Sequence, residues 1–301
     1  MRRLENQTTT RLLVLNDSEY LYQVNASVKK KAVARFAERD EAVVGQTDSA
    51  LVAVEEPLEI RINGEAYAVT MRTPGKDREL VAGYLFSEGV LKCRAEVGRL
   101  AHCHSGGRTD SNVVDYVPAA GLVVDVESGR RQNFSNSACG VCGRGGIDDL
   151  EKRLQGVQPA RVKVSVEELL VAGRELSTRG SFRHSGGVHA AAVLGNCREI
   201  AEVYEDVGRH NAVDKAVGAS LLAGTLPLRD QVLVVTSRAS FEIVQKAALA
   251  GLAGVACFSA PTSLAIETAN RVGLTLVGFL REDSCNVYSG ELLGGQSELC
   301  M

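Results

Sequence analysis

Apolar segments alternate with amphipathic ones along the second half of the chain. The short apolar runs lie at 190–194, 199–204, 231–235, 254–258 and 274–280. Stretches with helical spacing lie between several of them, at 211–223, 240–252 and 262–271. A repeated strand–helix–strand order is typical of parallel strands joined by right-handed crossovers. We therefore predict a larger α/β domain with a mostly parallel central sheet over residues 166–301.

A stricter alternation of apolar and polar residues marks the segment 51–135. Leu58, Ile60 and Ile62 alternate with polar residues, and Asn63-Gly64 then offers the positive φ angles that two-residue hairpins favour. The other expected elements are a helix at 76–87, strands at 113–117 and 122–126, and a loop at 103–107. This pattern predicts a small α+β domain.

The first 50 residues follow neither pattern. They are polar, and they include the basic run Lys29-Lys30-Lys31. A basic run of this kind usually belongs to a solvated surface. We therefore predict an N-terminal extension over 1–50, partly disordered, that forms a tail or a helix. Docking to an acidic partner is the alternative.

Composition and charge narrow the class of protein. The 301 residues are 45% hydrophobic, which is enough for two modest cores. The net charge of -3 lacks the basic excess typical of nucleic-acid binding. No run of 18 apolar residues and no signal peptide occurs, so we expect a cytoplasmic protein that does not enter membranes. In that compartment the eight cysteines should be reduced, and Cys197 and Cys257 should be core residues.

The stretch 136–165 links the two predicted domains and opens with a glycine-rich loop that carries Cys139 and Cys142. Glycine buries no side chain and loses much backbone entropy on ordering, so such a loop should be exposed or should face a ligand. Arg144 can favour the thiolate form of a neighbouring cysteine. These features predict chemistry at sulfur, with Cys139 and Cys142 as the catalytic candidates.

Three kinds of site remain open for this pair of cysteines. A structural zinc site needs two more ligands, which could come from Cys93, His102, Cys103 and His104. A thioredoxin-like dithiol needs a helix at the pair, which the following glycines disfavour. The third interpretation is a mobile nucleophilic cysteine that carries a persulfide, with a second thiol close by.

Small and hydroxyl residues follow two neighbouring strands of the predicted parallel sheet. Ser237 and Arg238 come directly after one apolar run, and residues 259–263 follow the next. Ligands of such folds bind beyond the carboxyl ends of the strands, and phosphate groups favour helix N-termini. The two segments together predict an anionic ligand, although ordinary helix capping explains each of them alone.

Two further polar segments come from loops of the same domain. Asp206, Arg209 and His210 precede a helix and could bind a purine edge, a sugar hydroxyl or a phosphate. His184 and His189 flank a Gly-Gly pair, and we expect them to line a pocket. A metal pair is the alternative, but this spacing does not place both rings on one helical face.

Four motifs carry a resemblance to a known family. They lie at 137–143, 185–191, 205–215 and 258–263, and their order is the same as in the family. Together they resemble the FdhD family, the formate dehydrogenase accessory sulfurtransferases. The likeness extends from about residue 56 to residue 288.

This resemblance implies a cytosolic, homodimeric maturation factor. Such a protein would accept sulfur from a cysteine desulfurase and pass it to the molybdenum bis(molybdopterin guanine dinucleotide) cofactor of formate dehydrogenase. Cys139 would carry the persulfide, and Cys142 would be the second thiol of the loop. The residues expected to contact the guanine dinucleotide are Phe258, Ser259, Ala260, Pro261, Thr262 and Ser263. The other candidate cofactor-binding residues are His189, Arg209, His210, Ser237 and Arg238.

The larger domain of the family is similar to the cytidine deaminase fold, but this chain lacks the zinc-binding pattern of deaminases. Those enzymes use His-x-Glu followed by Pro-Cys-x-x-Cys. Here two alanines follow His189, and the cysteine pair comes earlier and has no proline before it. We therefore expect no deaminase chemistry and assign no metal ligand. A rival function from another class is a chaperone that binds the cofactor and moves no sulfur.

Overall fold

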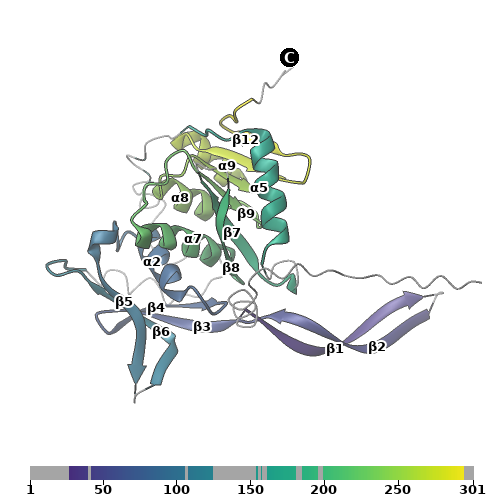
Figure 1. Cartoon of the computed structure of the whole chain (residues 1–301), viewed down its shortest axis with the longest axis horizontal. Helices are drawn as coiled ribbons and strands as arrows, with labels where there is room; N and C mark the ends of the chain where they lie inside the picture. Colours follow the sequence, from purple (N-terminus) through teal and green to yellow (C-terminus); the bar gives the residue numbers. More distant parts are fainter. Residues whose placement is uncertain are drawn as a thin grey trace, which may run out of the picture.

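The structure is a computed structural model that describes residues 27–39, 42–105, 108–124, 154, 157, 161–180, 185–195 and 199–294. These residues form three β-sheets and five α-helices (Figure 1). The mixed α/β class predicted from the sequence is confirmed.

A four-stranded sheet and one helix make up the part that we call the small module. Its strands are β3 (Glu56–Ile62), β4 (Glu65–Arg72), β5 (Val97–Ser105) and β6 (Arg108–Pro118), in the order β4-β3-β6-β5. The helix α2 (Asp77–Ser87) packs on this sheet, and a short 3-10 turn, Arg94–Glu96, precedes β5. The predicted hairpin turn is confirmed, because Asn63 and Gly64 have φ angles of 53° and 81° between β3 and β4.

Two expectations for the small module are wrong. The loop expected at 103–107 is strand as far as Ser105, because Cys103, His104 and Ser105 pair with β6. The strand expected at 122–126 is absent from 122–124. At 103–105 the backbone pairs with the next strand, and a local pattern of apolar residues does not report such pairing.

A six-stranded sheet forms the centre of the part that we call the large module. Its strands are β7 (His189–Leu194), β8 (Ile200–Asp206), β9 (Val232–Val235), β10 (Gly254–Cys257), β11 (Thr275–Gly278) and β12 (Asn286–Ser289). They follow the order β12-β11-β10-β9-β7-β8.

The predicted parallel crossovers are confirmed for β9, β10 and β11, but a mostly parallel sheet is wrong. Two of the five strand pairings are parallel, and β7–β8, β7–β9 and β11–β12 are antiparallel. The connections from β7 to β8 and from β11 to β12 are too short for a crossover helix, so each of these pairs folds back on itself.

Helices cover both faces of this sheet. Its two faces are covered by α5 (Val166–Thr178) on one side and by α7 (Arg209–Ala223), α8 (Phe241–Leu249) and α9 (Ser263–Val272) on the other (Figure 1). The strand β9 shows how alternation divides the core: Leu233 and Val235 pack with α7–α9, whereas Val232 and Val234 pack with α5.

Two glycines allow the modules to meet at backbone distance. A Cβ atom on Gly83 of α2 would lie 1.9 Å from the carbonyl oxygen of Asp214 on α7. A Cβ atom on Gly218 of α7 would lie 1.9 Å from the carbonyl oxygen of Glu79 on α2. Only residues without a side chain permit this approach, so the two helices are packed directly on each other.

The N-terminal extension contains strands where we expected a tail or a helix. β1 (Val28–Arg39) and β2 (Ala42–Ala53) form a separate antiparallel two-stranded sheet that extends away from both modules (Figure 1). The exposed run Lys29-Lys30-Lys31 lies on β1, so it belongs to a strand, along which successive side chains point to opposite faces. β2 also crosses the boundary predicted at residue 50. The remaining domain boundaries and the likeness to cytidine deaminase stay predictions.

Candidate functional site

The predicted binding residues of the large module come together at one edge of its sheet. Because β9 and β10 are parallel, the chain leaves both strands at the same edge, at Thr236 and at Phe258. β7 is antiparallel to β9, so its first residue, His189, lies at this edge too. Asp206 ends β8 opposite His189, and α7 begins at Arg209. We call this region the strand-end edge; it comprises His189 and residues 206–210, 236–240, 258–263 and 279–281.

Backbone hydrogen bonds join the connections that follow the three parallel strands. Thr262 N donates to the carbonyl oxygen of Ala239 at 3.0 Å, and Ala239 also forms a parallel bridge with Pro261. Phe279 N donates to the carbonyl oxygen of Ser259 at 3.1 Å. The segment 258–263 therefore lies beside the connections after β9 and after β11, and its predicted contact with a cofactor stays a prediction.

The two predicted residues after β9 differ in exposure. Ser237 is buried, and its hydroxyl group donates to the carbonyl oxygen of Arg238 at 3.0 Å. Arg238 is exposed. Of the two, Arg238 is therefore the residue whose side chain a ligand can reach without rearrangement.

Two neutral histidines and an arginine meet at the strand-end edge. Burial lowers the pKa of His210 to about 3, and the charges of Lys246 and Arg209 push it the same way. Burial also lowers the pKa of His189, with Arg209 as the second cause. Each ring is therefore neutral at physiological pH and offers one donor and one acceptor nitrogen.

Two polar atoms at this edge are left without internal partners. Nδ1 of His189 and Nε of Arg209 are buried and have no hydrogen-bond partner among the described residues. A buried polar group without a partner costs about 1–3 kcal/mol, so such groups are uncommon in folded proteins. Water or a ligand that supplied the missing partners would recover that free energy.

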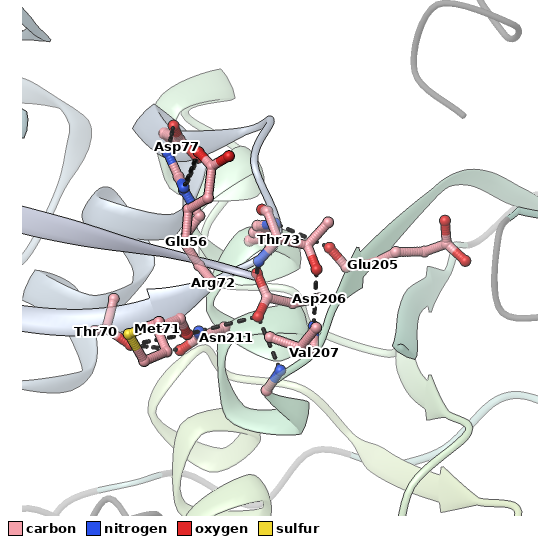
Figure 2. Close-up of polar contacts among 12 residues, drawn as sticks. Glu56, Thr70, Met71, Arg72, Thr73, Asp77, Glu205, Asp206, Val207 and Asn211 are labelled. Carbon is pink, nitrogen blue, oxygen red and sulfur yellow. Dashed lines mark hydrogen bonds and ion pairs between the residues drawn. The ribbon is translucent and has the colours of Figure 1, made fainter. Parts of the chain in front are cut away.

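Asp206 belongs to the same predicted cluster, but the molecule uses it internally. Its carboxylate is fully buried and accepts hydrogen bonds from Thr73 N at 3.1 Å and Asn211 Nδ2 at 3.1 Å. Gly208 N donates to it at 2.9 Å, and Lys215 Nζ lies 2.8 Å away. With these four partners, Asp206 is a structural residue (Figure 2).

The partners of Asp206 extend the network into the small module. Asn211 Nδ2 donates to the carbonyl oxygen of Met71 at 2.8 Å, and Lys215 Nζ donates to the carbonyl oxygen of Thr73 at 2.9 Å. Figure 2 shows this crossing from α7 to the end of β4. We call Met71, Thr73, Asp206, Asn211 and Lys215 the module seam.

A separate ion pair anchors the end of β4 within the small module. The guanidinium of Arg72 donates to both carboxylate oxygens of Asp77, at 3.1 and 3.0 Å. It also donates to the carbonyl oxygen of Ser111 and to Asn112 Oδ1. Arg72 is fully buried and its guanidinium has several acceptors, so it fixes the end of β4, which carries Met71 and leads into Thr73 (Figure 2).

The sequence did not single out three residues near this site, all at or on α8. Ser240 lies 3.3 Å from His210 Nε2, Glu242 lies 3.3 Å from His210 Nδ1, and Lys246 lies 3.3 Å from Glu242. Ser240 stands at the N-cap position, which a sequence pattern does report. Glu242 and Lys246 look like an ordinary surface pair on a helix, and only the fold buries them.

The cysteine loop lies outside the described residues, and so do His184 and Cys197. The roles of Cys139 and Cys142 therefore stay predictions. Cys257 is buried, and burial raises the pKa of its thiol to about 11, so the predicted core cysteine is confirmed.

The alternative zinc ligands are placed in part by the structure. Cys93 is exposed and Cys103 is half-buried, and neither forms a disulfide. His102 Nε2 lies 3.5 Å from Asp77 Oδ2, beside the Arg72 ion pair. Within the part of the chain that the structure describes, no three His, Cys, Asp or Glu side chains are grouped so that they could hold a metal ion.

Relatives of the chain cover most of its length. Sulfur carrier protein FdhD of Streptomyces avermitilis is 46% identical over 259 residues, which are 84% of this chain and 91% of that protein. The protein of the same name from Anaeromyxobacter sp. (strain K) is 46% identical over 286 residues, 90% of this chain and 99% of that protein.

A solved structure has a similar fold. It is a protein from Desulfotalea psychrophila, assigned as a formate dehydrogenase accessory protein. The two structures align with a TM-score of 0.67 at 22% identity, over 88% of this chain and 97% of the other. Among the described residues, no helix combines the length and the apolar character needed to cross a bilayer.

The family model that describes the FdhD/NarQ family matches residues 53–292. This range holds both modules, the cysteine loop and the strand-end edge, and it contains all four motifs noted in the sequence. The chain therefore belongs to the FdhD/NarQ family.

Proposed function

We propose that this protein is a sulfurtransferase that carries sulfur for the maturation of formate dehydrogenase, with Cys139 as the carrier thiol. The observation that carries the proposal is the 46% identity, over 84% and 90% of the chain, to relatives named sulfur carrier protein. The glycine-rich Cys139-Gly140-Val141-Cys142 segment supplies the nucleophile that this activity needs. A cytoplasmic homodimer is part of the same proposal, because the family resemblance implies it.

The first step moves a sulfur atom from the persulfide of a cysteine desulfurase. The Cys139 thiolate attacks the outer sulfur of that persulfide, and the desulfurase cysteine leaves as a thiolate. One S–S bond forms as another breaks, so the step needs no oxidant or reductant. Arg144 favours the thiolate that makes the attack.

The second step delivers sulfur at the oxidation level of sulfide, and Cys142 can supply the two electrons. Its thiolate attacks the Cys139 sulfur of the persulfide, which forms a Cys139–Cys142 disulfide and releases HS⁻. The acceptor is the molybdenum of bis(molybdopterin guanine dinucleotide), the substrate of this step. A cellular dithiol reductant then restores both thiols for the next cycle.

The strand-end edge suits the nucleotide part of that acceptor. The first turn of α8 has no side-chain cap, and Arg209 Nε has no partner among the described residues. Helix N–H groups and guanidinium groups are the donors that pyrophosphate prefers. We propose that the nucleotide contacts Arg209, His210, His189, Ser237, Arg238 and the segment 258–263.

Intact-protein mass spectrometry after incubation with a cysteine desulfurase and cysteine tests the sulfur step. We expect the wild type to gain one sulfur atom and then to release it as sulfide, with formation of the loop disulfide. Cys139→Ala should gain no sulfur, and Cys142→Ala should gain it and retain it. Cys93→Ala, which removes an exposed free thiol, is the matched control and should behave like the wild type.

The orphaned polar atoms at the strand-end edge also favour a second candidate, a chaperone that binds the cofactor without moving sulfur. This candidate predicts that Cys139→Ala still yields active formate dehydrogenase when it replaces the wild type. The sulfur-carrier proposal predicts an inactive formate dehydrogenase under the same conditions. An unchanged sulfur load on Cys139→Ala would reject that cysteine as the carrier.

A further inference from the structure

Ser240 stands at a helix N-cap but does not cap the helix. Its backbone is extended, with φ −92° and ψ 169°, and its side chain makes no capping hydrogen bond to α8. Thr262 occupies the same position before α9, and its hydroxyl accepts a hydrogen bond from Ala265 N at 3.3 Å. The Ser240 hydroxyl instead lies 3.3 Å from His210 Nε2. A long-range contact has therefore replaced a local one that serine usually makes.

A buried chain of alternating charges lies behind His210. Glu242 Oε2 lies 3.3 Å from His210 Nδ1, and Glu242 Oε1 lies 3.3 Å from Lys246 Nζ. Lys246 Nζ lies 2.5 Å from Asp214 Oδ2, and Ser87 Oγ donates to Asp214 Oδ1 at 3.0 Å. The Glu242, Lys246 and Asp214 side chains are 11%, 6% and 1% exposed. The chain thus connects α2 of the small module to the strand-end edge.

This arrangement determines which nitrogen of the His210 ring holds the proton. Glu242 Oε2 accepts no hydrogen bond within the described residues, but its negative charge lies 3.3 Å from Nδ1 and therefore favours the tautomer that has its proton on that nitrogen. Nε2 is then an acceptor, and the Ser240 hydroxyl must donate to it. The hydroxyl proton is therefore occupied, and the oxygen presents its lone pairs to a ligand.

We propose that Glu242, held in place by Lys246 and Asp214, is a positioning residue that fixes His210 in its Nδ1–H form and thereby aims Ser240 as a hydrogen-bond acceptor toward an N–H or O–H donor of a bound nucleotide. The ligand part rests on the proposed function, whereas the tautomer part rests on the geometry alone. Ser240 is partly exposed at the strand-end edge, so a ligand can reach it.

Ser240, His210 and Glu242 follow the same order as the serine, histidine and carboxylate of hydrolytic triads. Two roles of His210 therefore have to be compared: a general base, and a group that only orients the Ser240 hydroxyl. A general base works best when its pKa lies near the working pH. Burial and the charges of Lys246 and Arg209 keep the pKa of His210 at about 3, so its ring is a poor proton acceptor. A role in orienting the Ser240 hydroxyl requires only a neutral ring, which this environment provides.

The tautomer can be measured on the wild type by long-range ¹H–¹⁵N NMR of ¹⁵N-histidine-labelled protein. The chain has five histidines, and the spectrum of His210→Gln identifies the signals of His210. We expect Nδ1 to resonate as a protonated nitrogen and Nε2 as an unprotonated one. The reverse pattern would overturn the proposal.

A pair of matched glutamate variants tests whether Glu242 is the cause. Glu242→Gln should shift the His210 nitrogen signals toward a mixture of tautomers. Glu175→Gln removes a half-buried carboxylate that pairs with Arg179 at the same i,i+4 spacing, and it should leave the His210 signals unchanged. Identical His210 spectra for all three proteins would reject Glu242 as a positioning residue.

The ligand part is tested by calorimetry with GDP, inosine diphosphate and 2′-deoxy-GDP, which differ in the donors that they offer. We expect Ser240→Ala to bind GDP roughly three- to tenfold more weakly, the loss of one hydrogen bond. The wild type should lose a similar factor with one of the two analogues, and Ser240→Ala should not distinguish that analogue from GDP. Ser220→Ala, whose hydroxyl bonds within α7, is the control.

Two outcomes would contradict the ligand part in different ways. Equal GDP affinity of Ser240→Ala and wild type would show that Ser240 accepts nothing from the nucleotide. Absence of GDP binding to the wild type would reject the nucleotide site of the proposed function together with this part. The NMR result on the wild type would stand in either case, so failure of the proposed function and failure of the positioning role can be told apart.

Discussion

The module seam and the strand-end edge treat buried polar groups in opposite ways. At the seam, Asp206 has four partners within the molecule. At the edge, three residues further along the chain, Nε of Arg209 has none among the described residues. Internal partners stabilise the folded state, whereas a missing partner leaves a cost that a ligand can remove. The difference separates residues that hold the fold from residues that are free to bind.

One helix serves both regions because of its periodicity. Asn211, Asp214, Lys215 and Gly218 recur at helical spacing on α7, and each contacts or closely approaches the small module or the buried charge chain. Arg209 and His210 occupy the first turn, where the helix emerges at the strand-end edge. The motif at 205–215 is therefore part structural and part available for a ligand.

The largest expected effect comes from breaking the seam. Lys215 Nζ lies 2.8 Å from Asp206 Oδ2 in a fully buried pair, so Lys215→Met leaves a buried carboxylate without its cation. We expect a loss of roughly 3–5 kcal/mol in the free energy of unfolding, measured by urea denaturation.

The matched control is Lys163→Met, because Lys163 Nζ lies at the same 2.8 Å from Asp230 but is exposed. An exposed pair contributes at most about 1 kcal/mol, so the control should stay near the wild type. Similar losses of unfolding free energy for Lys215→Met and Lys163→Met would show that the module seam contributes no more than an exposed ion pair. The contrast between the module seam and the strand-end edge would then fail.

The sequence predicted the parts of this comparison that depend on local pattern. The hairpin at Asn63-Gly64, the parallel crossovers from β9 to β11 and the gathering of the strand ends follow from spacing and turn chemistry. The hairpin of β1 and β2 and the antiparallel pairings of β7 did not, because pairing between strands leaves no periodic signal.

The candidate site was predictable to the same degree. Arg209 and residues 258–263 could be placed at the strand-end edge from the order of the elements, whereas His189 could not, because it reaches this edge through the antiparallel pairing of β7 with β9. The contact of Ser240 with His210 could not be predicted, because His210 is 30 residues away in the sequence and a serine before a helix ordinarily predicts a cap. The structural role of Asp206 was also hidden, since its partner Thr73 is 133 residues away.

A smaller effect, on the edge side, should appear in the pH dependence of stability. The pKa of His210 is about 3 in the folded protein and its ordinary value is 6.5, so below pH 6.5 the unfolded chain binds more protons. The stability that His210 contributes is thus present above pH 6.5 and is lost as the pH falls toward 3. We expect a loss of roughly 1–3 kcal/mol between pH 6.5 and about 4.5, measured by urea denaturation.

Other groups titrate over the same pH range, so the useful quantity is the difference in stability loss between the wild type and His210→Gln. Burial raises the pKa of Asp214 to about 6, so its contribution has the opposite sign and falls as the pH rises from 3.8 to 6. His189, whose pKa burial lowers, acts in the same direction as His210. His210→Gln keeps both groups and should lose less stability than the wild type over this range. A steeper loss in the variant would contradict a neutral His210.

The smallest effect on the fold, and the sharpest test of the comparison, is expected from Arg209. Arg209→Ala removes a buried nitrogen that lacks a partner, so the free energy of unfolding at pH 7 should stay within about 0.5 kcal/mol of the wild type or rise. GDP affinity should fall roughly tenfold, because a charge-assisted hydrogen bond to phosphate contributes more than a neutral one. Arg209→Lys, which keeps the charge but not the planar fork, should lie between the two.

Calorimetry and urea denaturation on the same samples show whether Arg209 binds the ligand or holds the fold. Arg229→Ala, which removes an exposed arginine, should change neither quantity. If Arg209→Ala instead destabilised the protein as much as Lys215→Met and left GDP affinity unchanged, Arg209 would belong with the residues that hold the fold. A missing internal partner would then no longer mark a ligand site in this protein, because Arg209, which meets that criterion, would have failed the test.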